Sequence, residues 1–345
     1  MWRLRVATGC VLLTGLAFWQ LPGRIVPDTK VDLVVAPGAW LARALHAWDP
    51  AGNFGQMQNQ AYGYLWPMGP FFALGKLIGV PEWAVQRLWW ALLLCAAFTG
   101  VVLLAGRLGI GTPAARLAGG LVFALSPRIL SELGPVSVEA WPSAVAPWVL
   151  LPLVAFTNGP GTRGRLVRAV ALSGLAVATA GGVNATAVLA VLPLPVLWLL
   201  TVRPLRRRLV VATAWGIAVA CATAWWVVPL LLLGRYSPPF LQYIETAATT
   251  TRTTDAVSAV RGASHWLAYL SSAYGPSWPT GWRLATVVPV VVATMVVAGL
   301  GIAGLSRRGM PHRRFLIVAV LAGMAAVGFG HLSDLPDLNT MSANS

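Results

Sequence analysis

Long apolar segments constrain the fold of this chain more than any other sequence feature. Stretches of about 20 apolar residues, the length that an α-helix needs to cross a bilayer, recur along the sequence. Hydrophobic residues make up 57% of the 345 residues and charged residues only 10%, and the mean hydropathy is +0.71. A soluble domain needs far less apolar surface, so the composition predicts an all-α polytopic membrane protein.

The apolar segments predict about nine spans in residues 1–345. They lie at roughly 5–22, 83–105, 113–130, 141–157, 166–181, 185–202, 209–233, 284–305 and 314–331. Residues 62–80 are also long enough to cross, but they contain Pro67, Pro70 and Lys76, and broken backbone at membrane depth is tolerated only inside protein or beside a cavity. We therefore expect residues 23–82 to form a first external loop with a re-entrant or juxtamembrane segment, and residues 234–283 to form a long external loop.

The charges separate by sign if residues 62–80 return to the side that they left. All ten acidic residues then lie on one face. Fifteen arginines lie on the other: Arg3, Arg5, Arg107, Arg116, Arg163, Arg165, Arg168, Arg203, Arg206, Arg207, Arg208, Arg307, Arg308, Arg313 and Arg314. Because cytoplasmic loops carry an excess of Lys and Arg, this pattern predicts a plasma-membrane protein with a cytoplasmic N-terminus and an external acidic face. The net charge of +15 thus reflects inner-face loops and does not indicate nucleic-acid binding.

The loop at residues 27–66 gathers polar side chains that are scarce elsewhere. It holds the acidic residues Asp28, Asp32 and Asp49, the amides Gln56, Gln58, Asn59 and Gln60, and the aromatic residues Tyr62, Tyr64 and Trp66. Amides offer paired donors and acceptors for sugar hydroxyls, and aromatic faces suit sugar rings or prenyl chains. We interpret this loop as a sugar site at a membrane surface, although interface anchoring also explains its aromatic residues.

Asp28 is the candidate catalytic residue. It follows Pro27 shortly after the first span, and Asp32 comes four residues later, so both carboxylates project from one face if the segment is helical. A carboxylate at this level suits a general base that takes the proton of a sugar hydroxyl. The alternative is that Asp28 caps the helix and that Asp32 is simply solvated.

Two further external segments carry candidate substrate-binding residues. Residues 126–142 contain Arg128, Glu132 and Glu139, which either orient an acceptor or are ordinary interfacial charges. Arg261 and His265, four residues apart in the long loop, would pair on a helix face toward a lipid phosphate, with a solvated loop as the alternative. The sequence has no Cys/His set and no H-E-x-x-H motif, so it predicts no metal site, and it predicts no cofactor.

Four segments carry a resemblance to a known family. PDTKVDL, FGQMQNQAYGYLWPMGPFFALG, GVPEWAVQRLWWALLL and FALSPRILSELG resemble the N-terminal membrane region of the actinobacterial alpha-(1→3)-arabinofuranosyltransferases, the AftD family within the GT-C glycosyltransferases. The resemblance covers most of residues 20–155. It implies a GT-C-type transmembrane helix bundle with external loops and juxtamembrane helices, and it implies that the chain is the N-terminal portion of a longer protein.

The resemblance also implies a reaction. Arabinofuranose would pass from decaprenylphosphoryl arabinose, a lipid-phosphate sugar donor, to the arabinan acceptor of arabinogalactan or lipoarabinomannan, with inversion and with Asp28 as the base. A phosphate leaving group departs as an anion that nearby arginines can stabilise, so this reaction requires no metal. Members of the family are expected to bind an acyl carrier protein at the cytoplasmic face, which the inner arginine clusters would suit.

Two other functions stay open at this point. Another GT-C enzyme, such as a polyprenyl-phosphate mannosyltransferase or an oligosaccharyltransferase, would have the same architecture. A lipid or polysaccharide transporter would carry ionisable residues at mid-span positions and internal repeats. The nine predicted spans have essentially no such residues at mid-span, and the sequence has no evident repeat, so we favour chemistry at the external surface.

Overall fold

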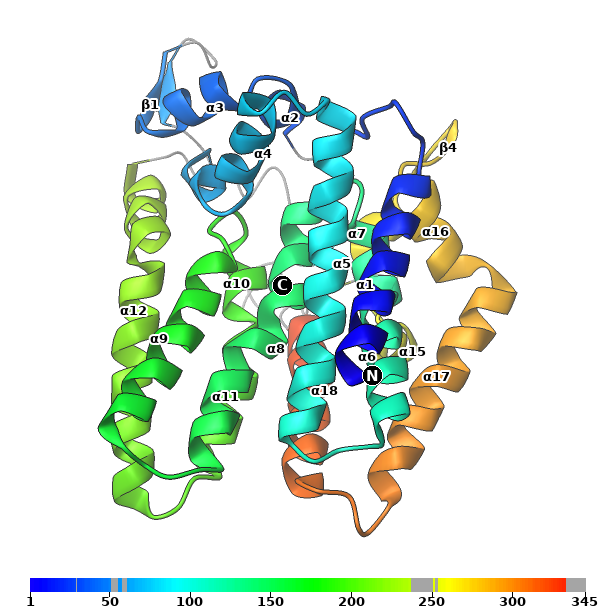
Figure 1. Ribbon diagram of the computed structural model, residues 1–345. Helices are drawn as coiled ribbons and strands as arrows, with labels where there is room; N and C mark the ends of the chain where they lie inside the picture. Colours follow the sequence, from blue (N-terminus) through cyan, green and yellow to red (C-terminus); the bar gives the residue numbers. More distant parts are fainter. Residues whose placement is uncertain (29, 51–54, 58–60, 237–250, 252–253, 333–345) are drawn as a thin grey trace, which may run out of the picture. The chain divides into compact units, whose positions relative to one another are not determined.

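The computed structural model describes residues 1–345 except 29, 51–54, 58–60, 237–250, 252–253 and 333–345. The chain forms two compact units (Figure 1): Met1–Leu125 with Glu132–Ser237, and Ser126–Ser131 with Pro238–Ser345. Helices dominate the described residues of both units. The strands among them are two antiparallel pairs of two residues each, β1 (Trp48–Asp49) with β2 (Gln56–Met57) and β3 (Ser271–Ser272) with β4 (Gly275–Pro276). The predicted all-α class is confirmed.

Four described helices are long and apolar enough to cross a membrane. They are α5 (Glu82–Arg107), α8 (Ser137–Thr157), α12 (Leu205–Tyr236) and α17 (Val288–Ser306), and each coincides with a predicted span. Other predicted spans coincide with α1 (Trp2–Trp19), α9 (Arg163–Thr179) and α18 (Arg313–Leu332). The predicted span at 113–130 is not a single helix, because α6 (Pro113–Ala124) ends within it and α7 (Pro127–Glu132) begins after a break. The predicted span at 185–202 is divided into α10 (Ala185–Leu189) and α11 (Pro193–Leu200), because Pro193 lacks the backbone donor that would continue a helix. The count of nine spans stays a prediction.

The first unit is built around α5 and α8, which pack against each other and against α1, α6 and α9. Between helices in lipid, small residues and hydrogen bonds replace the hydrophobic drive to associate. A Cβ on Gly100 of α5 would lie 2.7 Å from Nε1 of Trp148 on α8, so only glycine permits this approach. Indole N–H groups add hydrogen bonds between helices: Trp148 donates to the Ala96 carbonyl at 2.9 Å, and Trp215 donates to Ser173 Oγ at 2.8 Å.

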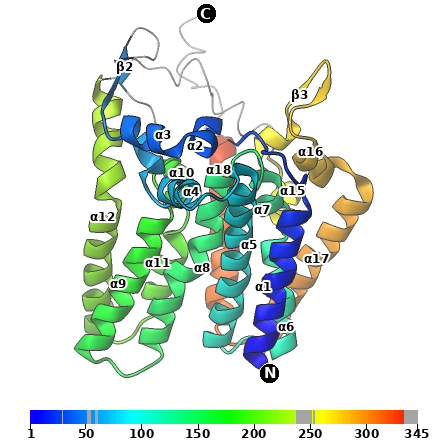
Figure 2. The same cartoon turned by 45° about the horizontal axis from the view of Figure 1, so that its top comes forward.

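Short helices of residues 31–77 lie across one end of this unit (Figure 2). They are α2 (Val31–Val35), α3 (Pro37–Ala44), η1 (Ala61–Leu65) and α4 (Met68–Leu77). The ten residues of α4 extend about 15 Å, half of the roughly 30 Å that a helix must cross. Residues 62–80 therefore contain no spanning helix, and their re-entrant or juxtamembrane position in a bilayer stays a prediction.

The arginine clusters of the first unit lie at one end, and its acidic residues lie at the other end together with several basic ones. The connections from α5 to α6, from α8 to α9 and from α11 to α12 lie at the end away from α2, α3 and α4 (Figure 1). These connections and the helix turns beside them carry the arginine clusters, whereas Asp28, Asp32, Glu82 and Glu139 lie at the end that the short helices cover. The unit is therefore polarised along its helices.

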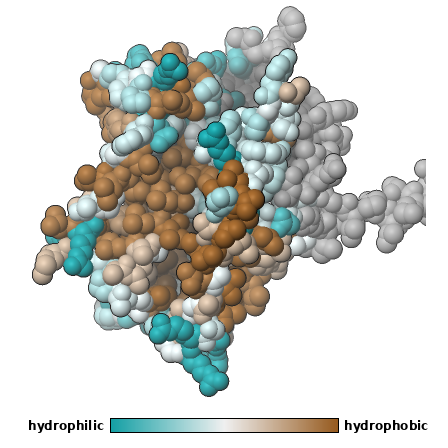
Figure 3. Space-filling view, turned by 90° about the vertical axis from the view of Figure 1, so that its right-hand side faces the viewer, coloured by the Kyte–Doolittle hydropathy of each residue, from teal (hydrophilic) through white to brown (hydrophobic). Residues whose placement is uncertain are grey.

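The second unit contains most of α7 (Pro127–Glu132), α15 (Ala256–Arg261), η2 (Trp266–Tyr269), α16 (Pro279–Thr286), α17 and α18. Within it α15 packs on α17 and α18, and α16 packs on η2 and α17. No residue of α17 is buried. Its exposed apolar side chains include Val288, Val292, Val296 and Leu300, as expected where lipid tails cover a helix. Apolar side chains (brown) cover much of the face drawn in Figure 3.

One close contact in the first unit gives a stability prediction. A Cβ on Gly63 of η1 would lie 2.5 to 2.6 Å from backbone atoms of Gly182 and Val183, which cannot turn aside as a side chain can. We expect Gly63→Ala to lower the free energy of unfolding by about 1–3 kcal/mol through overpacking. Thermal unfolding of the purified protein in detergent measures the effect.

Gly216→Ala is the matched control, because a Cβ on Gly216 of α12 meets no atom within 4 Å. Its Tm should stay the same or rise slightly, since alanine is favoured over glycine inside a helix by about 0.5–1 kcal/mol. Equal Tm values for the two variants would contradict the close packing of η1.

Candidate functional site

The carboxylate of Asp28 lies at the N-terminus of α8, 109 residues further along the chain. It accepts hydrogen bonds from the backbone N–H of Ser137 at 3.2 Å and from Ser137 Oγ at 2.5 Å, and the residue is only 6% exposed. Ser137 is the first residue of α8, so its N–H has no acceptor within the helix, and the helix dipole favours a negative charge there. Asp28 therefore caps a helix, but a distant one and not the helix that follows it.

A shared helix face for Asp28 and Asp32 required a helix through both residues, and the structure has none. The helix α2 begins only at Val31, with Lys30 as its N-cap and no side-chain capping bond. Asp32 lies in the first turn of α2 and is exposed. The two carboxylates therefore share no helix face: one is buried against α8 and the other lies at the surface.

A buried arginine holds the segment that leads from α1 to Asp28. Arg87 of α5 is fully buried and donates Nε to the Gln20 carbonyl at 2.8 Å, and its Nη2 group donates to two more carbonyls of this segment. Its guanidinium also lies over the ring of Trp90, 4.0 Å from the centroid. Gln20 is the C-cap of α1, where unpaired carbonyls and the helix dipole favour a cation. Arg87 thus closes the end of α1.

The neighbouring residue fixes the backbone just before Asp28. Gln86 is fully buried, its Oε1 accepts the N–H of Val26 at 2.9 Å, and its Nε2 donates to the Val26 carbonyl at 2.8 Å. Oε1 also accepts from Nη1 of Arg87 at 2.8 Å. Both polar groups of Val26 are thereby satisfied two residues before Asp28, so the path of the chain into the site is fixed by hydrogen bonds. Neither Gln86 nor Arg87 is among the predicted site residues, although a charged residue such as Arg87 inside an apolar span is itself a signal of function or of a special contact.

A second carboxylate lies in the first turn of α8. Glu139 follows Ser137 by two residues, is half-buried, and accepts a hydrogen bond from Nδ2 of Asn184 at 3.0 Å. Asn184 in turn caps α10, because its Oδ1 accepts the N–H of Ala187 at 3.1 Å. The start of α8 thus carries Asp28 on Ser137 and Glu139 on Asn184, two oriented carboxylates at one helix N-terminus.

Aromatic rings pack beside the start of α8. Trp89 of α5 donates Nε1 to Ser137 Oγ at 3.0 Å, so Ser137 links an indole to the carboxylate. The centroid of the Trp89 ring lies 4.8 Å from that of Trp141 and 5.3 Å from that of Phe71. Both ring pairs lie in the distance range of favourable aromatic packing, so packed rings support Ser137 and the Asp28 carboxylate that it binds.

One tyrosine of the opening loop, Tyr64, joins a cluster with cations, whereas Tyr62 packs against Ala180, Val188 and Trp226. Tyr64 is buried, with its ring centroid 5.8 Å from that of Trp40. The Trp40 ring has Arg43 at 4.7 Å and Lys30 at 6.0 Å from its centroid, within the range of cation–π contact. Tyr62 is half-buried, and this burial raises the pKa of its hydroxyl, which keeps the group a neutral hydrogen-bond donor. The sequence analysis did not single out Lys30 or Arg43, although both are basic residues within the polar loop.

A family model described as alpha-(1→3)-arabinofuranosyltransferase, N-terminal GT-C domain, matches residues 12–342. The chain belongs to this family. It is 44% identical over 328 residues to the alpha-(1→3)-arabinofuranosyltransferase of Mycobacterium tuberculosis and 45% identical over 331 residues to that of Mycolicibacterium smegmatis. These alignments cover 95% and 96% of this chain but 23% of each relative.

A solved relative supports the same assignment. The single-particle cryo-EM structure of arabinofuranosyltransferase AftD from mycobacteria superposes with a TM-score of 0.80 and 39% sequence identity, over 98% of this chain and 25% of that one. The AftD resemblance inferred from the opening segments is therefore confirmed, and it extends over nearly the whole chain.

The other predicted substrate-binding residues of the opening loop and of residues 126–142 lie on β2, on α7 or outside the described part of this AftD-family chain. Gln56 lies on β2, whereas Gln58, Asn59 and Gln60 lie outside the described residues. Glu132, at the end of α7, is fully buried. Arg128 is half-buried on the same short helix. A sugar-binding role of the amides stays a prediction.

The predicted pairing of Arg261 and His265 on one helix face is wrong. The helix α15 ends at Arg261, and Gly262 takes a left-handed conformation with φ +73°, so His265 falls beyond it as the N-cap of η2. Arg261 is buried and donates to Thr294 Oγ1 and to the Leu284 carbonyl, both at 2.9 Å. These bonds connect α15 to α16 and α17, so Arg261 has a structural role in the second unit.

The contacts of Asp28 predict that Ser137 stabilises the fold. Ser137→Ala removes a donor to a buried carboxylate and the acceptor of the Trp89 indole, so the free energy of unfolding should fall by about 1–3 kcal/mol. Thermal unfolding in detergent, followed by tryptophan fluorescence, measures the loss. Ser143→Ala is the matched control, because Ser143 lies on α8 and its side chain makes no hydrogen bond among the described residues. Equal losses would show that the bonds of Ser137 to Asp28 and Trp89 are unimportant.

Proposed function

We propose that this chain is the membrane-embedded catalytic part of an arabinofuranosyltransferase. The observation that carries the proposal is the buried carboxylate of Asp28, oriented at the start of α8 in a chain of the AftD family. The proposed donor is decaprenylphosphoryl arabinose, and the proposed acceptor is the arabinan of arabinogalactan or lipoarabinomannan. The chain spans 23% of the length of its curated relatives, so further segments are expected to contribute to the complete reaction.

In the proposed reaction an acceptor hydroxyl attacks the anomeric carbon from the face opposite the phosphate. Asp28 takes the hydroxyl proton as the new C–O bond forms, the bond to the lipid phosphate breaks, and the anomeric configuration inverts. Ser137 fixes the direction of the carboxylate, and the N-terminus of α8 stabilises its negative charge. The departing phosphate carries its own charge, so the step needs an electrostatic partner and no general acid.

Neighbouring groups have proposed binding roles. Glu139, oriented by Asn184, and Tyr62, a neutral donor, suit hydroxyls of the acceptor. Asp32 lies nearby in sequence on α2 and suits a weaker positioning role at the surface. For the leaving phosphate the proposed partners are Lys30 and Arg43, the basic residues of the opening loop that lie over the Trp40 ring. Arg261 instead donates structural hydrogen bonds to Thr294 and to the Leu284 carbonyl.

The proposed orientation places the acidic end outside and the arginine end in the cytoplasm. Support comes from the excess of arginines at a single end of the first unit, which is the cytoplasmic pattern in membrane proteins. An acyl carrier protein is the proposed cytoplasmic partner, since such proteins are acidic and the exposed arginines offer complementary charge.

A transporter is the second candidate, because Arg87 is a fully buried charge in α5, and ionisable groups within spans often mark transport paths. However, Arg87 is bonded to carbonyl groups at the end of α1 and to Gln86. Those bonds account for its presence without a transported substrate, which favours the transferase.

Replacement of Asp28 tests the proposed base. Asn has the size of Asp but cannot take a proton, so Asp28→Asn should lower turnover by about 10² to 10⁴. The assay follows transfer of labelled arabinofuranose from decaprenylphosphoryl arabinose to an arabinan oligosaccharide, in membranes containing the protein as its native gene encodes it.

Two other carboxylates serve as comparisons in the same assay. Asp32→Asn should cost much less turnover and act mainly on the KM of the acceptor, because Asp32 is exposed and has no bond to α8. Near-normal turnover of Asp28→Asn, together with loss in Glu139→Gln, would reassign the base to Glu139 and leave Asp28 as a structural cap.

Single-cysteine labelling tests the orientation. In a variant without the three native cysteines, new cysteines at the exposed positions Ala47 and Ser272 should react with an impermeant maleimide in spheroplasts. Cysteines at Gly161 and Gly309, which are exposed near arginine clusters, should react only after the membrane is permeabilised. The reverse pattern would invert the proposed topology.

A further inference from the structure

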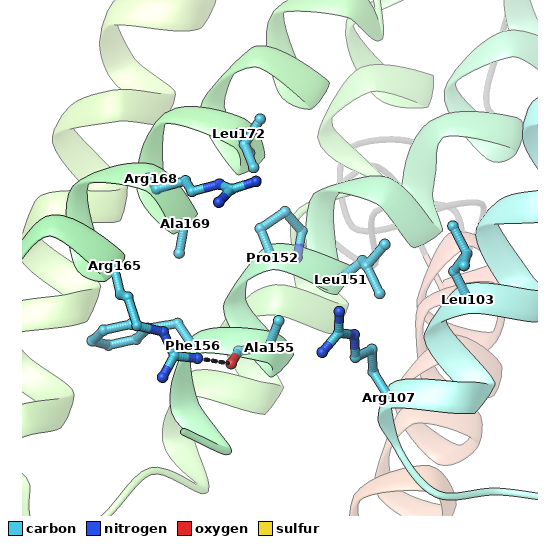
Figure 4. Close-up of a pocket in the computed structure, with 10 residues that line it drawn as sticks. All are labelled: Leu103, Arg107, Leu151, Pro152, Ala155, Phe156, Arg165, Arg168, Ala169 and Leu172. Atoms are coloured by element: carbon cyan, nitrogen blue, oxygen red, sulfur yellow. Dashed lines mark hydrogen bonds between the residues drawn. The ribbon is translucent and has the colours of Figure 1, made fainter. Parts of the chain in front are cut away.

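A cavity of about 360 Å³ lies among α5, α8 and α9 at the arginine-rich end of the first unit (Figure 4). Its apolar walls include Leu103 of α5, Leu151 and Pro152 of α8, and Leu172 of α9. Three arginines also line it, Arg107, Arg165 and Arg168, and no acidic residue does. The cavity therefore combines apolar walls with an uncompensated positive charge.

The three guanidinium groups differ in their hydrogen bonding. Arg165 is held by the backbone, because its Nη2 donates to the Ala155 carbonyl at 3.0 Å and its Nη1 to the Pro160 carbonyl at 3.2 Å. Arg107 and Arg168 extend from α5 and α9 toward the space between them (Figure 4), and neither makes a hydrogen bond or ion pair within the described part of the chain. Two such cations that line one cavity with no acidic residue beside them favour the binding of an anion there.

We propose that this cavity binds an anionic phospholipid. The phosphate lies between Arg107 and Arg168, and the part of an acyl chain next to the headgroup packs against Leu103, Leu151 and Leu172. Guanidinium groups present paired donors that match phosphate oxygens. Basic pockets between membrane-spanning helices on the cytoplasmic side are suited to such headgroups. This site lies at the end of the unit away from Asp28 and does not depend on the proposed transferase reaction.

The apolar walls distinguish a lipid from other anions. The cavity lies between α5 and α8, both long and apolar enough to cross a membrane. Arg107 lies nearer the arginine-rich end of α5 than Leu103, and Arg168 lies nearer that end of α9 than Leu172. A phospholipid presents its headgroup and acyl chain in the same order. Free phosphate would gain nothing from these walls. An acidic protein would contact the exposed arginines but has no group that requires an apolar cavity between helices. A bound lipid would connect α5 to α9 through Arg107 and Arg168.

Native mass spectrometry of the purified, delipidated chain in neutral detergent tests the proposal. The probes are dioleoyl phosphatidylglycerol and dioleoyl phosphatidylcholine, titrated separately. The wild-type protein should bind the anionic lipid about tenfold more tightly than the zwitterionic one. The double variant Arg107→Gln/Arg168→Gln should lose about tenfold or more in affinity for phosphatidylglycerol, with little change for phosphatidylcholine.

Two further variants control for net charge and for folding. Arg3→Gln/Arg163→Gln removes the same charge from exposed arginines outside the cavity, so its affinity for phosphatidylglycerol should stay within about twofold of the wild type. Leu172→Trp keeps every arginine but fills the apolar part of the cavity, so it should weaken phosphatidylglycerol binding. Circular dichroism and gel filtration should give the same profiles for all variants.

Three outcomes would overturn the proposal. Equal losses in the two double variants would mean that surface charge alone attracts the lipid. Displacement of the lipid by millimolar inorganic phosphate, with no effect of Leu172→Trp, would assign the cavity to a free anion. Unchanged lipid binding in Arg107→Gln/Arg168→Gln, with loss of binding to an acidic acyl carrier protein, would assign the arginines to a protein surface.

Discussion

Two helix ends of opposite polarity hold the site together. The C-terminus of α1 presents carbonyl groups to the buried guanidinium of Arg87, and the N-terminus of α8 presents an N–H group to the buried carboxylate of Asp28. Each charge is stabilised by the helix end that it closes. The short segment between these two points is also held midway, where the N–H and the carbonyl of Val26 both bond to Gln86.

Both buried charges are held by hydrogen bonds at helix ends. Burial of a charge in an apolar medium is costly unless hydrogen bonds or a partner charge compensate it. Arg87 donates to carbonyl groups at the end of α1 and to Gln86, and Asp28 accepts from the backbone N–H and the hydroxyl of Ser137. These bonds fix the direction of the Asp28 carboxylate, which suits a proton acceptor.

Hydropathy was enough to predict the helical class and the positions of the long helices. A segment of about 20 apolar residues is long enough to cross a bilayer, and in lipid it forms a helix because its backbone groups must bond to one another. The choice of Asp28 rested on the scarcity of acids and on the resemblance of the opening segments. Its contact with Ser137 could not be predicted, since 109 residues separate the two and no periodicity records such a contact. The pairing of Arg261 with His265 failed because four-residue spacing has meaning only while a helix continues, and Gly262 ends it.

The bonds between α1 and Asp28 also set how far neighbouring helices can slide. A shift of α1 along α5 by one helical turn, about 5.4 Å, would break the hydrogen bonds of Arg87 and Gln86 together. A similar shift of α8 would separate Ser137 from both Asp28 and Trp89. Three helices are thus locked in axial register at this end, and the bond from Trp148 to the Ala96 carbonyl holds α5 to α8 further along. The arginine-lined cavity among α5, α8 and α9 therefore lies at the far end of two helices, α5 and α8, that cannot slide past each other.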